Sequence, residues 1–469
     1  MSRFKLFIQN FLVYGIGGVI SKIIPFIMLP VITRLMPDTF YFGLNDISTV
    51  VISFGQALAI MGMYDAMFRM FFEKEDAEYK KDICSSALAF VALSSVVIFV
   101  GMLLFQNKLS EWSFGSSEYK NLLVLSAMSI LIGSTNSIVA APTRMNNKRG
   151  IFLITNTLSP IISYSISIPL LMRGMYIVAL PLAGVISAVT MEITFLILNR
   201  EWFRLKRVRW DYIKSMLKIA LPLVPNFLIY WIFSSCDRLM IAKMLGNDFA
   251  GIYAIGGKIG QVSQLIYTAF AGGWQYFAFS TMKDSDQVEM TSKIFEYLGV
   301  ITFAAGMFMA AVSEPVFNIL FTGDYVQGQI VAPYLFVAPL FLMLFQVIGN
   351  QFLVIKKTWP NALILSIGAI ANIVLNFVLI PIIGIEGAAI ATYLGYVIAI
   401  IVAVIVLTKM HLVKISSRFL GVTVVYTAFM FLWRGLFVNN CIVSLLLAVV
   451  FVVIFVCVYL KDIKKLLNK

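Results

Sequence analysis

The sequence contains few residues of the kinds that catalyse reactions or hold metals. Histidine occurs once, as His411, and the four cysteines (Cys84, Cys236, Cys441 and Cys457) show no CxxC spacing. Histidine acid–base chemistry and a histidine-rich metal site are therefore excluded, and the cysteines indicate buried thiols rather than disulfides. The sequence has no Walker-type Gly-rich loop, so we do not expect ATP to drive the protein directly. We expect no metal and no other cofactor.

Charged residues are also scarce. They make up 13% of the chain, whereas a soluble domain has about 25%. Hydrophobic residues make up 60%, and the mean hydropathy is +0.92. Apolar runs of about 20 residues recur along the chain, each long enough to cross about 30 Å of hydrocarbon as a helix. None shows the alternation of a barrel strand, so the sequence predicts an all-α polytopic membrane protein.

The apolar runs predict about fourteen transmembrane helices. The N-terminal run is too long for a signal peptide and lacks a small-residue cleavage site, so we interpret it as the first span. The predicted spans are residues 7–29, 43–63, 83–104, 121–141, 151–172, 175–197, 219–244, 249–275, 294–313, 327–353, 361–381, 384–408, 419–437 and 441–460.

The positive charges predict the orientation in the membrane. Most of the 36 Lys and Arg residues fall in the loops that are cytoplasmic if the N-terminus is cytoplasmic. Because short cytoplasmic loops carry such an excess, we expect both termini on the cytoplasmic side. This topology and contact with anionic lipid headgroups explain the net charge of +13, so nucleic acid is not an expected partner.

The densest basic stretch, REWFRLKRVRWDYIKSMLK at 200–218, divides the chain into two similar parts. We expect it to be a cytoplasmic linker with an amphipathic helix in the membrane interface. FLVYGIGGVISK at 11–22 resembles FLIYWIFSSCDR at 227–238, which places Lys22 opposite Arg238. Because an even number of spans separates the two stretches, the halves would be related by a pseudo-two-fold axis along the membrane normal.

The predicted architecture is therefore two lobes of six helices with two helices appended. The predicted boundaries are 1–199 for the N-terminal lobe, 200–218 for the basic linker, 219–410 for the C-terminal lobe, and 411–469 for the last two helices and a cytoplasmic tail.

Polar residues on four predicted spans indicate a hydrophilic passage. A charge at the bilayer centre costs about 2.5–3.5 kcal/mol on insertion scales, so charges that remain there usually face a water-filled cavity. Spans one, two, seven and eight carry polar side chains at helical spacing on otherwise apolar helices. These residues are Lys22; Asp46, Thr49, Ser53 and Gln56; Asn226, Tyr230, Ser234, Asp237 and Arg238; and Lys258 and Gln261.

Three cations in this set, Lys22, Arg238 and Lys258, favour an anionic substrate, because ammonium and guanidinium groups bind phosphate and carboxylate. Two alternatives stay open. The stem of Lys22 could instead extend to the interface. Asp46 and Asp237 either neutralise the cations or bind H⁺ or Na⁺ and couple transport to a gradient.

Three stretches carry a resemblance to a known family. They are NFLVYGIGGVISKIIPFIMLPVITRLMPDTFYFGLND, DAMFRMFFE, and LPLVPNFLIYWIFSSCDRLMIAKMLGNDFAGIYAIGGKIGQVSQLI. Together they resemble the Wzx-type oligosaccharide flippases, which share a superfamily with the MATE exporters and the MurJ-type lipid II flippases. In this resemblance Asp237-Arg238 matches the family's Asp-Arg, Tyr253-Ala254 to Lys258 matches its Tyr-Ala-x-x-x-Lys, and Arg69 matches its arginine after span two.

The resemblance implies a flippase and not an enzyme. Such a protein would move an undecaprenyl-pyrophosphate-linked oligosaccharide from the cytoplasmic to the outer leaflet of a bacterial inner membrane, by alternating access, for assembly of O-antigen, capsule or exopolysaccharide. Its expected partners are this lipid-linked substrate, H⁺ or Na⁺, membrane lipids and a polysaccharide polymerase. Arg69 would lie at the cytoplasmic entrance, and Pro25 is a candidate hinge because proline interrupts a helix.

Two other functions are open. A MATE-like, cation-coupled multidrug exporter would prefer an acidic or apolar passage. The three cations therefore argue against this function. A polysaccharide polymerase or ligase would need catalytic groups on an external face. The acids expected there, Glu111, Glu118, Glu314 and Asp324, are interpreted as solvated loop charges.

Overall fold

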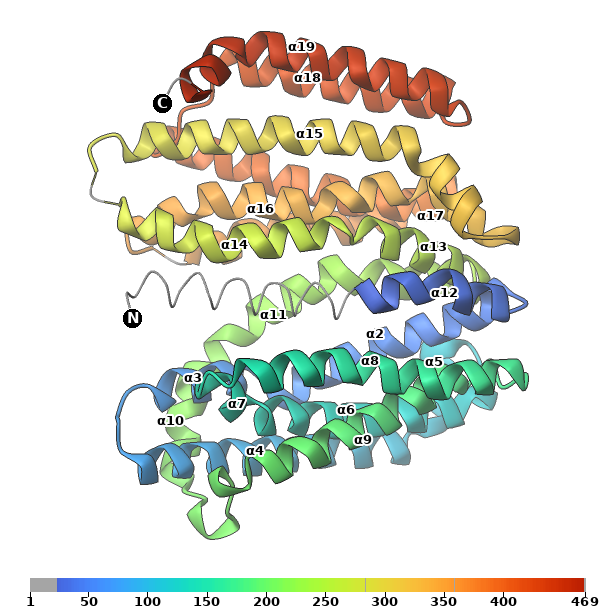
Figure 1. Ribbon diagram of the computed structural model, residues 1–469, viewed down its shortest axis with the longest axis vertical. Helices are drawn as coiled ribbons and strands as arrows, with labels where there is room; N and C mark the ends of the chain where they lie inside the picture. Colours follow the sequence, from blue (N-terminus) through green and yellow to red (C-terminus); the bar gives the residue numbers. More distant parts are fainter. Residues whose placement is uncertain (1–22, 283, 358, 468–469) are drawn as a thin grey trace. The chain divides into compact units, whose positions relative to one another are not determined.

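The computed structural model describes residues 23–467 with the exception of 283 and 358, and helices joined by turns make up this part of the chain (Figure 1). Eleven helices within it are long and apolar enough to cross a membrane. The chain is therefore an all-helical, multi-pass membrane protein, as its composition predicted.

The number eleven is smaller than the predicted fourteen for identifiable reasons. Helix α17, Trp359–Lys409, joins two predicted spans across a break at Ile383 and Gly384, where the φ of the glycine is +64°. Of the first predicted span, 7–29, only the part from Ile23 onward is described, within the shorter helix Ile23–Leu35. The eighth span is two shorter helices, α13 (Asn247–Gly260) and α14 (Ser263–Ser280).

The chain divides into two compact units between Gly251 and Ile252. The predicted lobes, 1–199 and 219–410, describe a repeat in the sequence, and this repeat remains a prediction. The packing of the helices divides the chain elsewhere, after Gly251. The reason is that the helices directly after the basic segment pack against those of the first unit: α10 lies against α3 and α4, and α11 and α12 lie against α2. Residues 219–251 therefore belong to the first unit.

The helices of the first unit are α2 (Thr39–Ile60), α3 (Met63–Phe71), α4 (Ala77–Leu104), α5 (Gln106–Phe114), α6 (Lys120–Val139), α7 (Ala141–Met145), α8 (Arg149–Met172), α9 (Ala179–Leu198), α10 (Trp210–Ala220), α11 (Val224–Trp231) and α12 (Asp237–Met244), preceded by Ile23–Leu35. The second unit contains most of α13, together with α14 and α17. Its other helices are α15 (Gln287–Leu320), α16 (Ala332–Val354), α18 (Ser417–Leu432) and α19 (Cys441–Leu467).

The basic segment contains an amphipathic helix, α10, whose apolar face packs against the protein. Its place in the membrane interface remains a prediction. Ile213, Met216 and Ala220 are buried, and the latter two pack in one cluster with residues of α3 and α4 such as Met67 and Ile83. The apolar partners of this face come from α4 and from α3, a short helix that the sequence analysis did not separate.

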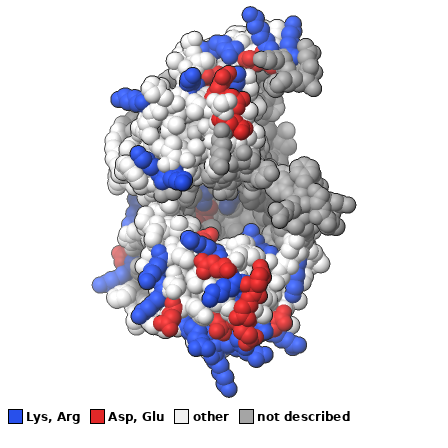
Figure 2. Space-filling model, turned by 90° about the vertical axis from the view of Figure 1, so that its left-hand side faces the viewer, with Lys and Arg blue, Asp and Glu red and all other residues white. Residues whose placement is uncertain are grey.

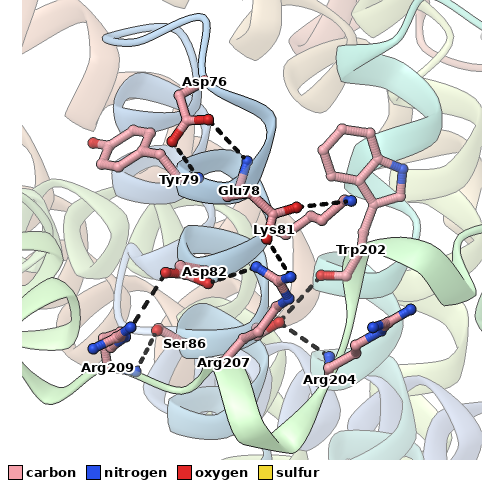
Figure 3. A network of polar contacts seen from close by, with 11 residues as sticks. Asp76, Glu78, Tyr79, Lys81, Asp82, Ser86, Trp202, Arg204, Arg207 and Arg209 are labelled. Atoms are coloured by element: carbon pink, nitrogen blue, oxygen red, sulfur yellow. Dashed lines mark hydrogen bonds and ion pairs between the residues drawn. The ribbon is translucent and has the colours of Figure 1, made fainter.

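The chain just before α10 is held on α4 by polar contacts (Figure 3). Arg207 forms ion pairs with Glu78 and with Asp82, the latter at 3.2 Å. The hydroxyl of Ser86 accepts a hydrogen bond from the backbone N–H of Arg209 at 2.9 Å. Charged side chains of both signs gather on the face of the first unit that Figure 2 presents. The basic segment is thus attached to the unit by a defined network.

The last two helices are attached to the second unit through two buried carboxylates. Glu296 of α15 accepts hydrogen bonds from the Ser416 N–H at 2.7 Å, from the Ser416 hydroxyl at 2.8 Å and from the Tyr459 hydroxyl at 3.2 Å. Glu386 of α17 forms two contacts with the Arg434 guanidinium, at 2.5 and 2.8 Å. These contacts fix α18 and α19 on α15 and α17.

We expect Glu296→Ala to destabilise the second unit measurably. It removes the acceptor of three donors, and a buried donor left unsatisfied costs about 1–3 kcal/mol. The measurement is thermal unfolding in detergent, with Lys293→Ala on the same helix as the control. Lys293 pairs with Glu289 on the surface, and loss of such an exposed pair changes stability by less than about 1 kcal/mol. Equal effects of the two substitutions would contradict the proposed attachment.

Candidate functional site

The strongest candidate site is a buried ion pair in the first unit. Asp46 lies in the second turn of α2, which begins after Asp38 caps the helix by accepting a hydrogen bond from the N–H of Phe40 at 3.0 Å. Arg238 is the second residue of α12. Its Nη1 lies 3.2 Å from Oδ1 of Asp46, and the two side chains are only 9% and 2% exposed. The structure therefore brings together two residues that are far apart in the sequence and that the sequence analysis placed on different spans.

Asp237 lies next to this pair and is also buried. Its Oδ1 accepts a hydrogen bond from the backbone N–H of Arg238 at 2.8 Å. Asp237 and Arg238 make additional interactions. The second oxygen of Asp46, Oδ2, is buried without a hydrogen-bond partner among the described residues. Two carboxylates and one guanidinium thus share this site, and the charge of Arg238 is balanced within the protein.

A π-helical turn positions the Asp-Arg pair. Residues Ile232–Cys236 form this turn between α11 and α12. A π turn inserts an extra residue into the helix and is common at functional sites. The predicted stripe of Asn226, Tyr230 and Asp237 assumed a regular α-helix, so this prediction needs correction. The extra residue rotates Asp237 relative to the other two, because each residue adds about 100° in a regular helix.

Close backbone packing accompanies the ion pair. A Cβ on Gly43 of α2 would lie 1.9 Å from the Asn247 carbonyl oxygen, and a Cβ on Gly251 would lie 2.0 Å from the Thr39 carbonyl oxygen. Glycine is required on both sides because the backbones of α2 and α13 approach so closely. Gly43 is one helical turn before Asp46, so this packing sets the position of Asp46 relative to α12.

The other residues of the predicted stripe on span two have ordinary partners. Ser53 accepts a hydrogen bond from Trp231 Nε1 at 3.1 Å, and the amide of Gln56 donates to the Ser129 carbonyl of α6 at 3.2 Å. The hydroxyl of Thr49 donates to the Asn45 carbonyl one turn earlier at 3.1 Å. Ser53 and Gln56 therefore link α2 to its neighbours within the unit.

The remaining predicted residues lie elsewhere. Asn226 and Tyr230 are on α11, and Tyr230 is 38% exposed. Lys258 lies in the last turn of α13 and Gln261 in the break before α14, both in the second unit. Arg69 is exposed at the end of α3, and Pro25 lies within the helix Ile23–Leu35. Lys22 lies outside the described residues.

The sequence analysis overlooked Glu192. This residue is on α9, and its Oε2 is buried without a hydrogen-bond partner among the described residues. The signal was available, since Glu192 is the only charged residue in the predicted span 175–197. Among the described residues no group of three or more His, Cys, Asp or Glu side chains could hold a metal ion.

The arrangement around Arg238 is suited to anion binding. A guanidinium presents planar donors that match phosphate and carboxylate oxygens, and its contacts are stronger away from water. In this structure a carboxylate of the protein contacts the guanidinium, so a substrate anion would have to compete with Asp46 for it.

Comparison with known proteins gives a family and a fold. A family model described as "Polysaccharide biosynthesis protein" matches residues 31–329. The structure is similar to lipid II flippase MurJ in an inward closed conformation, with a TM-score of 0.72 and 18% identity over 96% of this chain and 99% of that one. No curated protein matches the chain significantly.

Two further solved structures share the fold. A multidrug resistance MATE family transporter of the MOP superfamily, in an inward-facing conformation, gives a TM-score of 0.63 and 14% identity over 84% of this chain and 98% of that one. A MOP superfamily transporter from Pyrococcus furiosus gives a TM-score of 0.59 and 13% identity over 87% of this chain and 95% of that one. At these identities the likeness shows the fold alone.

Proposed function

Because the chain belongs to the polysaccharide biosynthesis protein family and has the fold of MOP superfamily transporters rather than that of an enzyme, we propose that it is a flippase for a lipid-linked oligosaccharide. The proposed substrate is an undecaprenyl-pyrophosphate-linked repeat unit of O-antigen, capsule or exopolysaccharide. It moves from the cytoplasmic to the outer leaflet of a bacterial inner membrane. Both termini are cytoplasmic in this proposal, and H⁺ or Na⁺, membrane lipids and a polysaccharide polymerase are its further partners.

The observation that carries the proposal is the buried guanidinium of Arg238 beside Asp46. A sugar chain with a pyrophosphate cannot cross about 30 Å of hydrocarbon unaided, and a charge kept within a membrane-spanning segment usually marks a substrate path. We propose that Arg238 binds the pyrophosphate after Asp46 releases it. Lys22 and Lys258 are proposed as further substrate-binding cations of the transport cycle, and alternating access is the proposed mechanism.

Reconstitution tests this function directly. We expect liposomes that contain the protein to move a labelled polyprenyl-pyrophosphate oligosaccharide between leaflets, and protein-free liposomes to move none on the same timescale. Lys258→Ala is expected to slow the movement at least tenfold, because one cation for the phosphates is lost. Gln264→Ala, on the next helix, is the control and is expected to leave the rate within twofold.

The exporter function is the alternative outcome of this experiment. If no lipid-linked oligosaccharide moves, but an imposed ion gradient drives a cationic dye across the membrane, the protein is a drug exporter and the flippase proposal is wrong. The shared fold with MATE family transporters is the reason to include the dye.

A further inference from the structure

Glu192 differs from the other carboxylates in the interior of the protein. Among the described residues, four carboxylates are buried as whole residues, Asp46, Asp237, Glu296 and Glu386. Each has a donor: Asp46 and Glu386 contact arginines, Asp237 accepts from a backbone N–H, and Glu296 accepts from three groups.

Glu192 lacks such a contact at one of its carboxylate oxygens. Its Oε2 is covered by protein and has no hydrogen-bond partner among the described residues, and no ion pair involves its carboxyl in this part of the chain. It lies in the membrane-spanning helix α9, Ala179–Leu198. An ionised carboxylate that is shielded from water and unpaired is costly, whereas the neutral acid is not. This oxygen of Glu192 therefore lacks the stabilising contact that the four buried carboxylates have.

Two residues of α6 lie beside the carboxyl, Thr135 and Asn136. The Thr135 hydroxyl donates its hydrogen to carbonyl oxygens of its own helix, those of Leu131 at 3.2 Å or Ile132 at 3.0 Å. The hydroxyl can rotate, so it can either donate this hydrogen to the Glu192 carboxylate or accept a hydrogen bond from the protonated acid.

Asn136 has a side-chain amide that can donate a hydrogen bond. Its Nδ2 is a buried donor with no hydrogen-bond partner among the described residues. A small side-chain movement would let this amide donate to an ionised Glu192. The pair of neighbours can thus accept a hydrogen bond from the protonated form and donate one to the ionised form. Such a setting suits a group that changes its protonation state during a cycle.

Among the described residues, no fixed charge of the neighbouring elements faces Glu192. Helix α9 packs against α6, α8, α2 and the turn Arg200–Trp202. The charged and titratable residues of those elements lie at other depths or have other partners. They are Lys120 at the first position of α6, Arg149 at the first position and Tyr164 in the middle of α8, Tyr41 and Asp46 near the start of α2, and Arg200 and Glu201 after the end of α9.

We propose that Glu192 is the carboxyl that binds and releases the coupling proton of transport. This inference rests on the proposed function, since it assigns the coupling ion and the residue that carries it. A proton from the aqueous phase on one side adds to a carboxylate oxygen of Glu192. The same O–H bond breaks when the unit changes conformation, and the proton leaves to water on the other side. Asp46 and Asp237 then serve as counter-charges for Arg238.

The first test compares variants in liposomes with an imposed pH gradient and the labelled polyprenyl-pyrophosphate oligosaccharide. We expect the gradient to accelerate the wild type at least tenfold and to leave Glu192→Gln, which resembles the protonated form, unaccelerated. Glu192→Asp, which keeps the titrating group, is expected to regain part of the acceleration. Thr194→Val on the same helix keeps the wild-type response, because the Thr194 hydroxyl bonds only within its own helix in this structure.

A second measurement does not depend on transport. Infrared difference spectra of the lipid-reconstituted protein between acidic and alkaline pH are expected to show a band of a protonated carboxylic acid that titrates in the wild type and is missing from Glu192→Gln. An unchanged band in Glu192→Gln overturns the inference, as does a gradient response equal to that of the wild type.

The two proposals can fail separately. If the wild type moves no lipid-linked oligosaccharide, the proposed function is wrong, and the infrared band still decides whether Glu192 titrates. If the wild type moves the substrate but the pH gradient does not accelerate it, the flippase proposal stands and the proton-coupling inference is wrong.

Discussion

Arg238→Ala is expected to abolish movement of the lipid-linked oligosaccharide and also to destabilise the first unit. The guanidinium is the proposed phosphate ligand and, within the part of the chain that the structure describes, the only ion-pair partner of Asp46. Removing one member of a buried pair leaves an uncompensated charge and costs about 3–5 kcal/mol. A loss of transport in this variant alone would therefore have two explanations, substrate binding and folding.

A variant with three substitutions separates these explanations. In Asp46→Asn, Asp237→Asn and Arg238→Gln the two carboxylates and the guanidinium of the site are all removed, and neutral groups of similar size remain. Buried charged groups can be replaced together by uncharged residues with little net loss of stability, so we expect thermal unfolding close to that of the wild type. Transport should still be lost, since no guanidinium is present. If this stable variant moved substrate at the wild-type rate, Arg238 would not be a substrate ligand.

Gly43→Ala and Gly251→Ala are expected to have the second large effect. Each new methyl group would lie about 2 Å from a backbone carbonyl oxygen, 1.9 Å for Gly43 and 2.0 Å for Gly251. A backbone cannot rotate away as a side chain can, so α2 and α13 would have to separate. Overpacking of a tight contact destabilises by about 1–3 kcal/mol, and occasionally by more. We expect at least the upper end of this range for each variant, measured by thermal unfolding in detergent.

Gly101→Ala is the matched control for this experiment. Gly101 also lies in a transmembrane helix, α4, and a Cβ there would have no atom within 4 Å among those considered for contact. Alanine favours a helix over glycine by about 1 kcal/mol, so this variant should be as stable as the wild type or more stable. If Gly43→Ala behaved like Gly101→Ala, the backbones of α2 and α13 would not be in contact as described.

The candidate site was partly predictable from residues alone. Asp46, Asp237 and Arg238 were identified because charges are costly within apolar spans, a property of single residues that the sequence reveals. That Asp46 contacts Arg238 was not predictable, because the sequence does not show which cation on another span a buried carboxylate meets. Glu192 is the only charged residue of α9, but it does not share a helical stripe with the other polar residues there, which are Ser187, Thr190 and Thr194.

The sequence by itself determined that the chain is a helical membrane protein, that it contains many segments apolar enough to cross a bilayer, and which charges remain among them. These properties follow from hydrophobicity along the chain, and each run expresses them independently of its neighbours. Only the tertiary structure decided that α10 is covered by α3 and α4, that a π turn redirects the Asp-Arg pair toward α2, and that the chain divides at Gly251. These features depend on packing between segments far apart in sequence, which no local pattern specifies.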